Sequence, residues 1–206
     1  MKGTDKKKRS KLITILGILL VICGVVLIIY PFLEIGLDKK EISQNVSEWD
    51  KQKGEVIKEV KSNNKANQKY PTIKVDGKDI IGKIIVVKTG KQIPILMGAT
   101  EENLRGGATL YDNGVFPGED GTAIVLGHRE TTFGFLEDIN VGDEIDIETV
   151  TGTYKFELKK TYITDPEDKS ILAQEKDLNL TLVTCYPFRY VGPAPDRFIA
   201  KLELIK

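Results

Sequence analysis

The sequence feature that most constrains the fold is an uncharged, apolar run near the N-terminus, from Leu12 to Phe32. In a helix that rises about 1.5 Å per residue, a run of this length spans roughly 30 Å, the thickness of the hydrocarbon layer of a membrane. Within that layer every backbone polar group must be bonded inside the segment, so a single span has to be a helix. We therefore predict a transmembrane helix over residues 12–32, in which Cys23 faces lipid and has no functional role.

The charges that flank this run predict its orientation. Residues 1–11 carry six basic side chains and one acidic side chain, which favours a cytoplasmic tail and an extracellular remainder. A cleaved signal peptide is the alternative, but its apolar core would be shorter and a cleavage site of small residues would follow it. We therefore expect a single-pass protein of the cell membrane. The remainder has more acidic than basic residues, so we expect no nucleic-acid partner, because such binding usually requires a basic face.

Residues 33–70 are predicted to form an extracellular stalk and linker. The segment is polar apart from one apolar stripe with helical spacing, made of Ile42, Val46, Trp49, Val56 and Val60. Gly54 interrupts the stripe, and the polar residues 62–69 follow it as a flexible linker. We interpret the segment as a spacer between membrane and domain; a regulatory segment that covers the active site is the alternative.

Residues 71–206 change to short apolar stretches separated by turn residues, which predicts an all-β domain. Residues 144–149 and 153–164 alternate apolar and polar side chains, and residues 122–128 form a short apolar strand that ends in His128. Thr100 is a candidate N-cap of a short helix. About eight strands with little helix indicate a closed barrel or a sandwich.

The last two predicted strands bring two polar side chains together. Leu178–Cys185 and Arg197–Ile205 are rich in strand-forming residues, and the connection between them contains three prolines and Gly192. If these strands pair antiparallel, Cys185 and Arg197 lie at the same rim of the sheet.

Cys185 is the only cysteine outside the apolar run, and His128 is the only histidine in the chain. A buried cysteine is often a small apolar residue without chemistry. However, a cysteine, a histidine and an arginine that each lie at a strand end match the arrangement that a thiol nucleophile needs. The sequence therefore predicts a cysteine-dependent active site.

These motifs resemble those of the sortases, the membrane-anchored cysteine transpeptidases of Gram-positive bacteria. The resemblance lies in Thr-Leu-Val-Thr-Cys at residues 181–185, in Arg197 twelve residues later, and in Gly-His at the end of an upstream strand. The sequence Cys-Tyr-Pro-Phe from Cys185 and Gly-Pro-Ala-Pro-Asp-Arg from Gly192 is most similar to class D. The resemblance covers roughly residues 72–206 and implies a closed eight-stranded sortase-type β-barrel.

The resemblance also implies the reaction and its partners. The substrate would be a surface protein with a C-terminal sorting signal of Leu-Pro-X-Thr-Gly (LPXTG) type, cleaved after Thr through a thioester. The acceptor would be the amine of a peptidoglycan precursor, so the product is a protein anchored to the cell wall. A protease that only hydrolyses the thioester and a wall-binding β domain without chemistry remain the alternatives.

The resemblance assigns roles to individual residues. Cys185 is the nucleophile, His128 exchanges protons with the two amines, and Arg197 donates hydrogen bonds to the substrate or to the oxyanion. Arg129 and Arg189 compete with Arg197 for this last role. Further expected substrate-binding residues are Thr184, whose alternative is a packed strand residue, and the apolar pair Ile171 and Leu172.

No cofactor or metal is predicted for this chain. The sequence has no Gly-rich phosphate loop and no Cys/His cluster with zinc spacing. Some sortases bind calcium, and residues 118–120 together with Asp165, Glu167 and Asp168 are the acidic candidates here. They do not form a recognisable calcium loop, so we interpret them as solvated carboxylates.

Overall fold

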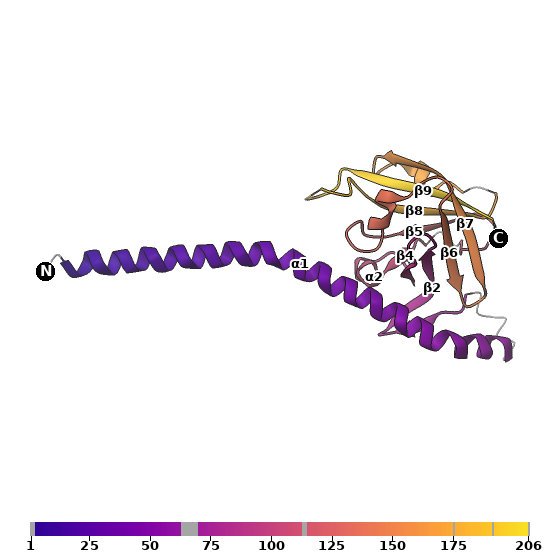
Figure 1. The fold of residues 1–206 in the computed structure, drawn as a ribbon, viewed down its shortest axis with the longest axis horizontal. Helices are drawn as coiled ribbons and strands as arrows, with labels where there is room; N and C mark the ends of the chain where they lie inside the picture. The colour runs from indigo at the N-terminus through magenta and orange to yellow at the C-terminus, as the bar shows by residue number, and fades with distance from the viewer. Residues whose placement is uncertain (1–2, 63–69, 113–114, 175, 191, 206) are drawn as a thin grey trace. The chain divides into compact units, whose positions relative to one another are not determined.

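The computed structural model describes residues 3–62, 70–112, 115–174, 176–190 and 192–205. The chain divides into two compact units, residues 1–37 and 38–206. A single helix, α1 (Gly3–Ser62), supplies the described part of the first unit and the beginning of the second (Figure 1). Each unit is therefore described separately.

The first unit is helical and exposes its apolar side chains. Ile13, Leu20 and Leu27 are each 70% exposed, and their apolar neighbours along residues 13–33 are exposed as well. A helix with this surface is unfavourable in water, because apolar area is stabilised only when it leaves water. α1 is long and apolar enough to cross a membrane, in agreement with the span predicted over residues 12–32.

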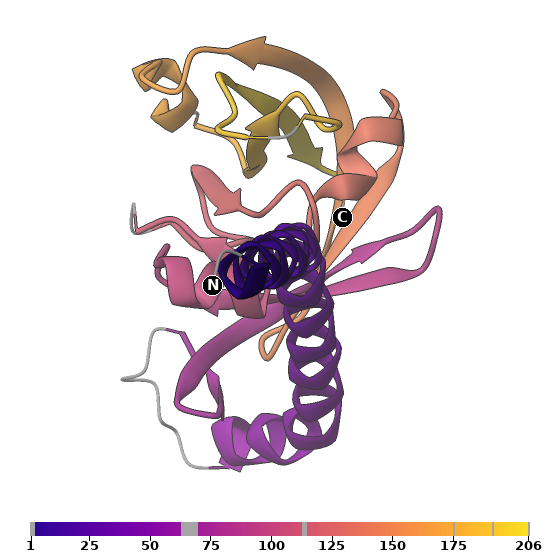
Figure 2. The same ribbon diagram turned by 90° about the vertical axis from the view of Figure 1, so that its left-hand side faces the viewer.

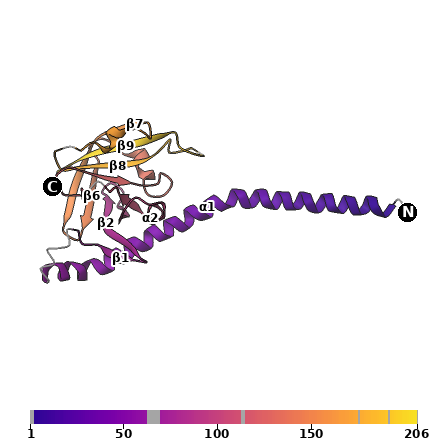
Figure 3. The same ribbon diagram turned by 180° about the vertical axis from the view of Figure 1, so that it is seen from behind.

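The second unit contains a closed β-barrel. Eight strands form a ring in the order β2-β3-β4-β5-β8-β9-β7-β6, which closes where β6 pairs with β2 (Figures 1 and 3). A ninth strand, β1, pairs with β2 outside the ring. The eight-stranded barrel predicted from the sequence is thus confirmed. The strands are β1 (Ile73–Val75), β2 (Lys78–Val86), β3 (Lys91–Met97), β4 (Ala108–Leu110), β5 (Thr122–Leu126), β6 (Glu144–Thr149), β7 (Thr153–Thr164), β8 (Asn179–Tyr186) and β9 (Asp196–Leu204).

Side-chain alternation fills the barrel interior. In β6, Ile145 and Ile147 are fully buried, whereas Glu144, the first residue of the strand, is exposed. The same period-two pattern brings apolar residues of the ring strands into one core cluster, which includes Ile84, Ile95, Val125, Phe156 and Leu182. This interior core holds the strands that carry the site in register.

Short helices join the strands. Helix α2 (Glu101–Gly106) begins at Thr100, whose side chain accepts a hydrogen bond from the backbone N–H of Asn103, so the predicted N-cap is confirmed. Two 3₁₀ helices follow, η1 (Gly134–Asp138) and η2 (Lys169–Leu172). η2 begins directly after the acidic segment 165–168 that follows β7, and its Ile171 packs against β5, β8 and β9.

Residues 38–62 of α1 pack against the barrel, which differs from the free spacer expected for residues 33–70. Trp49 is fully buried in a cluster with residues of β1, β2 and β3, and its Nε1 donates to Glu148 Oε1 over 3.1 Å. Asn45 donates to the carbonyl of Gly106 in α2. The helix continues through Gly54, because burial of the stripe outweighs the cost of about 1 kcal/mol for an internal glycine. The linker predicted over residues 62–69 lies almost wholly outside the described residues.

Charged groups accompany this packing. The Lys83 ammonium is buried, with Asp50 Oδ1 at 2.6 Å, Gln92 Oε1 at 2.8 Å and Glu148 Oε1 at 3.7 Å. Lys53 donates to the same Glu148 oxygen over 2.7 Å. Burial of Glu148 acts to raise its pKa, but the hydrogen bonds from Lys53 and Trp49 and the charge of Lys83 together lower that pKa below its ordinary value.

Candidate active site

The strand pair β8–β9 brings Cys185 and Arg197 together as the sequence predicts. The two strands are antiparallel, and Cys185 is the direct register partner of Arg197. Both residues are partly exposed, and Cys185 is a free thiol. Directly opposed residues have Cβ atoms about 4.5–5.5 Å apart on one face of the sheet. A thiol and a guanidinium therefore occupy adjacent positions at one end of the barrel.

His128 joins them because β5 runs parallel to β8 on the other side. Leu126 is the partner of Val183, and the Gly127 N–H extends the ladder with a bond of 3.1 Å to the Val183 carbonyl. The next residue, His128, follows at the height of Cys185. It is partly exposed, like the thiol. Two strand pairs, one parallel and one antiparallel, thus bring three distant parts of the sequence to one edge.

The three residues also share a face of the sheet. Ile124, Val183 and Ile199 form an apolar cluster on the outside of the barrel, separate from its interior core, and Leu126 packs against it. Two residues beyond Val183 and Ile199, towards the same end of the sheet, the alternation in β8 and β9 reaches Cys185 and Arg197, and His128 lies two residues after Leu126, beyond the end of β5. The register therefore places Cys185 and Arg197 next to this outer apolar face, and His128 follows at the same end of the barrel.

Helix η2 covers part of that outer face. Ile171 is 8% exposed and belongs to the same apolar cluster, whereas Leu172 is 41% exposed. Asp168 caps η2 by accepting from the Ser170 N–H and also accepts from the Thr164 hydroxyl; the bond from Thr164 is the main cause of its lowered pKa. Figure 2 shows η2 with β8 and β9 at the top, on the opposite side of the barrel from the end of α1.

Thr184 has a structural contact that the sequence did not indicate. Its side chain is buried at 3% exposure, and its hydroxyl donates to the Gly127 carbonyl over 2.7 Å. The bond ties the residue before Cys185 to the residue before His128. Its role toward a substrate stays a prediction.

The three candidate arginines differ sharply in their surroundings. Arg197 donates through Nη1 to the carbonyls of Asp196 at 3.0 Å and Ala194 at 3.5 Å. Arg189 is 85% exposed and pairs with Glu137 on the surface. Arg129 is buried, and its guanidinium donates to backbone carbonyls of the β8–β9 loop.

A lysine of β3 supports the turn that follows His128. Lys91 Nζ donates to the carbonyls of Thr131 and Thr132 over 3.0 and 2.9 Å. Burial lowers the pKa of Lys91, and the positive charge of Lys39 lowers it further. The Thr132 hydroxyl closes the turn by donating to the His128 carbonyl. The backbone that carries the imidazole is therefore fixed from two directions.

Three of the acidic residues considered for calcium, Glu119, Asp165 and Asp168, accept hydrogen bonds from protein groups. Glu119 accepts from the Tyr70 hydroxyl and from the Phe116 N–H, and Asp165 accepts from the Glu167 N–H. Among the described residues, no group of three or more His, Cys, Asp or Glu side chains has the arrangement of a metal site. The expectation of no bound metal stays a prediction.

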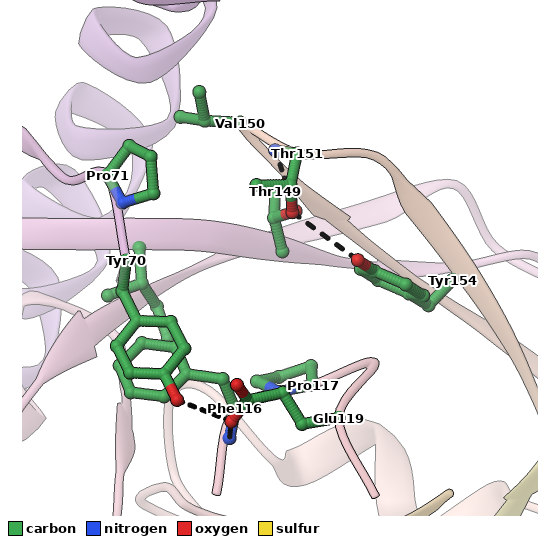
Figure 4. A pocket seen from close by; sticks show the side chains of 10 residues that line it. Tyr70, Pro71, Phe116, Pro117, Glu119, Thr149, Val150, Thr151 and Tyr154 are labelled. Atoms are coloured by element: carbon green, nitrogen blue, oxygen red, sulfur yellow. Dashed lines mark hydrogen bonds between the residues drawn. The ribbon is translucent and has the colours of Figure 1, made fainter. Parts of the chain in front are cut away.

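A pocket of about 220 Å³ lies at the other end of the barrel (Figure 4). Its lining includes Tyr70, whose ring stacks on that of Phe116, and Tyr154 at the start of β7. Arg197 pairs instead with Thr164 at the far end of β7. The pocket thus contains no member of the triad.

Comparisons with known proteins agree with this arrangement. The family model for the sortase domain matches residues 84–205. Sortase D of Bacillus subtilis is 35% identical over 119 residues, which are 57% of this chain and 60% of that protein, so the match spans less than two thirds of the relative.

Solved structures extend the likeness to the fold. The Sortase D5 transpeptidase of Clostridium perfringens superposes with a TM-score of 0.66 at 27% identity, covering 81% of this chain and 99% of that one. For sortase A of Listeria monocytogenes the TM-score is 0.56 at 26% identity, over 62% and 88% of the two chains. The resemblance to class D predicted from the sequence is confirmed by the two class D relatives. With the family model matching more than half of its length, this chain belongs to the sortase family.

Proposed function

We propose that this sortase is a cysteine transpeptidase that cleaves a C-terminal sorting signal of LPXTG type and transfers the protein to an amine. The observation that carries the proposal is the strand register, in which Cys185 is opposite Arg197 and His128 lies two residues beyond the end of β5, the strand parallel to β8. One thiol, one imidazole and one guanidinium at a single strand edge suit acyl transfer.

The first step forms the thioester. The Cys185 thiolate attacks the carbonyl carbon of the peptide bond after Thr, forming a C–S bond and a tetrahedral oxyanion. As the oxyanion collapses, the C–N bond breaks and His128 gives its proton to the leaving amine. Arg197 stays protonated throughout and donates hydrogen bonds to the oxyanion.

The second step transfers the acyl group. An incoming amine attacks the thioester carbonyl, and neutral His128 takes the proton that this amine loses. The C–S bond then breaks and restores the Cys185 thiolate. We propose the amine of a peptidoglycan precursor as the acceptor, so the product is a protein joined to the cell wall.

The outer face next to the triad supplies the substrate groove in this proposal. Ile171 anchors η2 to the apolar cluster, and the exposed Leu172 offers apolar area to the Leu-Pro part of the signal. The membrane helix at residues 12–32, with a cytoplasmic tail before it, holds this groove on the outer surface of the cell membrane.

Peptide cleavage with and without an added amine tests the proposal. The full-length protein in detergent is given a fluorogenic peptide with an LPXTG signal, and the products are separated by mass spectrometry. We expect an amide product when the amine is present and a thioester on Cys185 when the amine is limiting. With Cys185→Ala we expect neither the amide nor the thioester. Cleavage that survives Cys185→Ala refutes the nucleophile. Hydrolysed product alone, at any amine concentration, identifies a protease, and an inert wild-type protein supports a non-catalytic domain.

A further inference from the structure

The residue after His128 holds the loop between Cys185 and Arg197. Arg129 is 7% exposed, and its Nη1 donates to the Pro187 carbonyl over 2.8 Å. Its Nη2 donates to the carbonyls of Tyr190 and Gly192 over 3.0 and 3.1 Å. Its Nε donates to Glu130 Oε1 over 2.6 Å. One buried cation thus connects three points of the loop to the end of β5.

The loop between β8 and β9 has few hydrogen bonds within its own backbone. Pro187, Pro193 and Pro195 have no N–H group to donate. Among the described residues of the loop, 187–190 and 192–195, no backbone–backbone hydrogen bond is formed. Among its described residues, the first half of the loop also has aromatic contacts, such as Phe188 against Phe198 at 5.1 Å between ring centroids, and one ion pair on the exposed surface, between Arg189 and Glu137. The Arg129 guanidinium is therefore the principal polar support of this segment.

The C-terminal end of the loop in turn contacts the guanidinium of Arg197, the register partner of Cys185. Arg197 donates to the carbonyl of Ala194 in the loop and to the carbonyl of Asp196, the first residue of β9. A shift of the loop therefore changes where Arg197 points, while the strand ladder keeps its backbone fixed. We propose that Arg129 is the positioning residue of this active site, which sets the β8–β9 loop and through it the aim of Arg197 toward Cys185 and His128.

The chemistry of the contact requires an arginine. A guanidinium is planar and has five donors in a fixed fork, so it can serve Nε and both terminal nitrogens at once. A lysine keeps the charge but concentrates it in one nitrogen, which cannot reach carbonyls that lie on different sides of the fork. Arg129→Lys therefore separates the geometric role from the mere presence of a cation.

The test measures catalysis and loop order on the full-length protein in detergent. Arg129→Lys and Arg129→Ala are compared with Arg189→Ala, a matched control that removes an exposed arginine from the same loop. The catalytic readout is kcat and KM for the LPXTG peptide, and it rests on the proposed function. The second readout is independent of activity: the rate at which chymotrypsin cuts after Phe188 or Tyr190, followed by mass spectrometry.

We expect both Arg129 variants to lose roughly 10- to 100-fold in kcat, the cost of a misplacement of about 1 Å, with a much smaller change in KM. Chymotrypsin should cut their loops several-fold faster, and Arg189→Ala should match the wild type in both assays. Added methylguanidinium should restore part of the kcat of Arg129→Ala, whereas methylammonium should not.

A wild-type kcat and an unchanged cutting rate in Arg129→Lys overturn the proposal. Equal rescue by both cations overturns the requirement for a fork. If Arg129→Ala does not fold, Arg129→Lys alone decides between these results. If the wild-type protein cleaves no peptide, the proposed function fails, and the cutting rates still decide whether Arg129 orders the loop.

Discussion

Replacement of Trp49 measures how strongly the second part of α1 is bound to the barrel. This side chain is fully buried against β1, β2 and β3. A tryptophan buries about 150–250 Å², which at about 25 cal/mol per Å² corresponds to roughly 4–6 kcal/mol. Trp49→Ala leaves the Cβ in place and a cavity behind, so we expect a loss of about 3–5 kcal/mol in the free energy of unfolding.

Thermal unfolding of the full-length protein in detergent, followed by circular dichroism, tests this value. For a unit of this size the loss corresponds to a fall in Tm of roughly 6–20 °C. Trp49→Phe keeps most of the apolar contact and loses the bond to Glu148, so it should cost about 1–2 kcal/mol. Ser47→Ala, on the exposed side of the same helix, is the control and should leave Tm unchanged. A Tm for Trp49→Ala within 2 °C of the wild type, a shift of less than about 1 kcal/mol, would refute the docking of this helix.

Three further outcomes are expected. A Cβ at Gly127 would lie 2.8 Å from the Phe133 ring, so Gly127→Ala should displace the backbone before His128 and lower kcat roughly 10- to 100-fold, as measured with the LPXTG peptide. Because the folded-state pKa of Glu148 is lowered, its stabilisation is complete above the unfolded value of about 4.3 and is lost as pH falls below it. The fluorescence emission of Trp49, the only tryptophan, should therefore shift to longer wavelength in acid. Glu148→Gln should abolish the part of this pH dependence that comes from the Glu148 carboxylate. Arg197→Lys should lower kcat roughly 100- to 1,000-fold with an unchanged Tm, whereas wild-type kcat would exclude Arg197 from oxyanion binding.

Several strands could be predicted from local patterns, whereas the choice of a closed barrel over a sandwich came from the resemblance to the sortases. Alternation in residues 144–149 and 153–164 indicated two strands, and both form with these limits. The Thr100 cap followed from the residue type alone. These features depend on side chains that are neighbours in sequence, so the pattern contains the information needed.

The pairing of strands at the candidate site was predictable for a different reason, because the motif residues lie at or next to strand ends. Cys185 and Arg197 are joined by an antiparallel register that a two-strand pattern with a loop already implies. His128 required more, since its partner strand is parallel and distant in sequence. His128 was identified as a candidate because it is the only histidine in the chain, and not from a local strand pattern.

The roles of Arg129 and of residues 38–62 could not be read from the sequence. Arg129 binds carbonyl groups 58 to 63 residues away, and a carbonyl belongs to every residue, so no side-chain pattern marks the partner. The stripe around Trp49 indicated a helix but not its burial, because the surface that receives it consists of three strands with separate positions in the sequence. Such contacts depend on the finished arrangement of the strands.

The order of strands in the ring has a consequence for biosynthesis. β8 lies between β5 and β9, so the histidine and the thiol become neighbours only through strands made far apart in time. β9 must also be inserted between β8 and β7 before the ring can close. A nascent chain that lacks β9 therefore can neither close the ring nor place Arg197 beside Cys185.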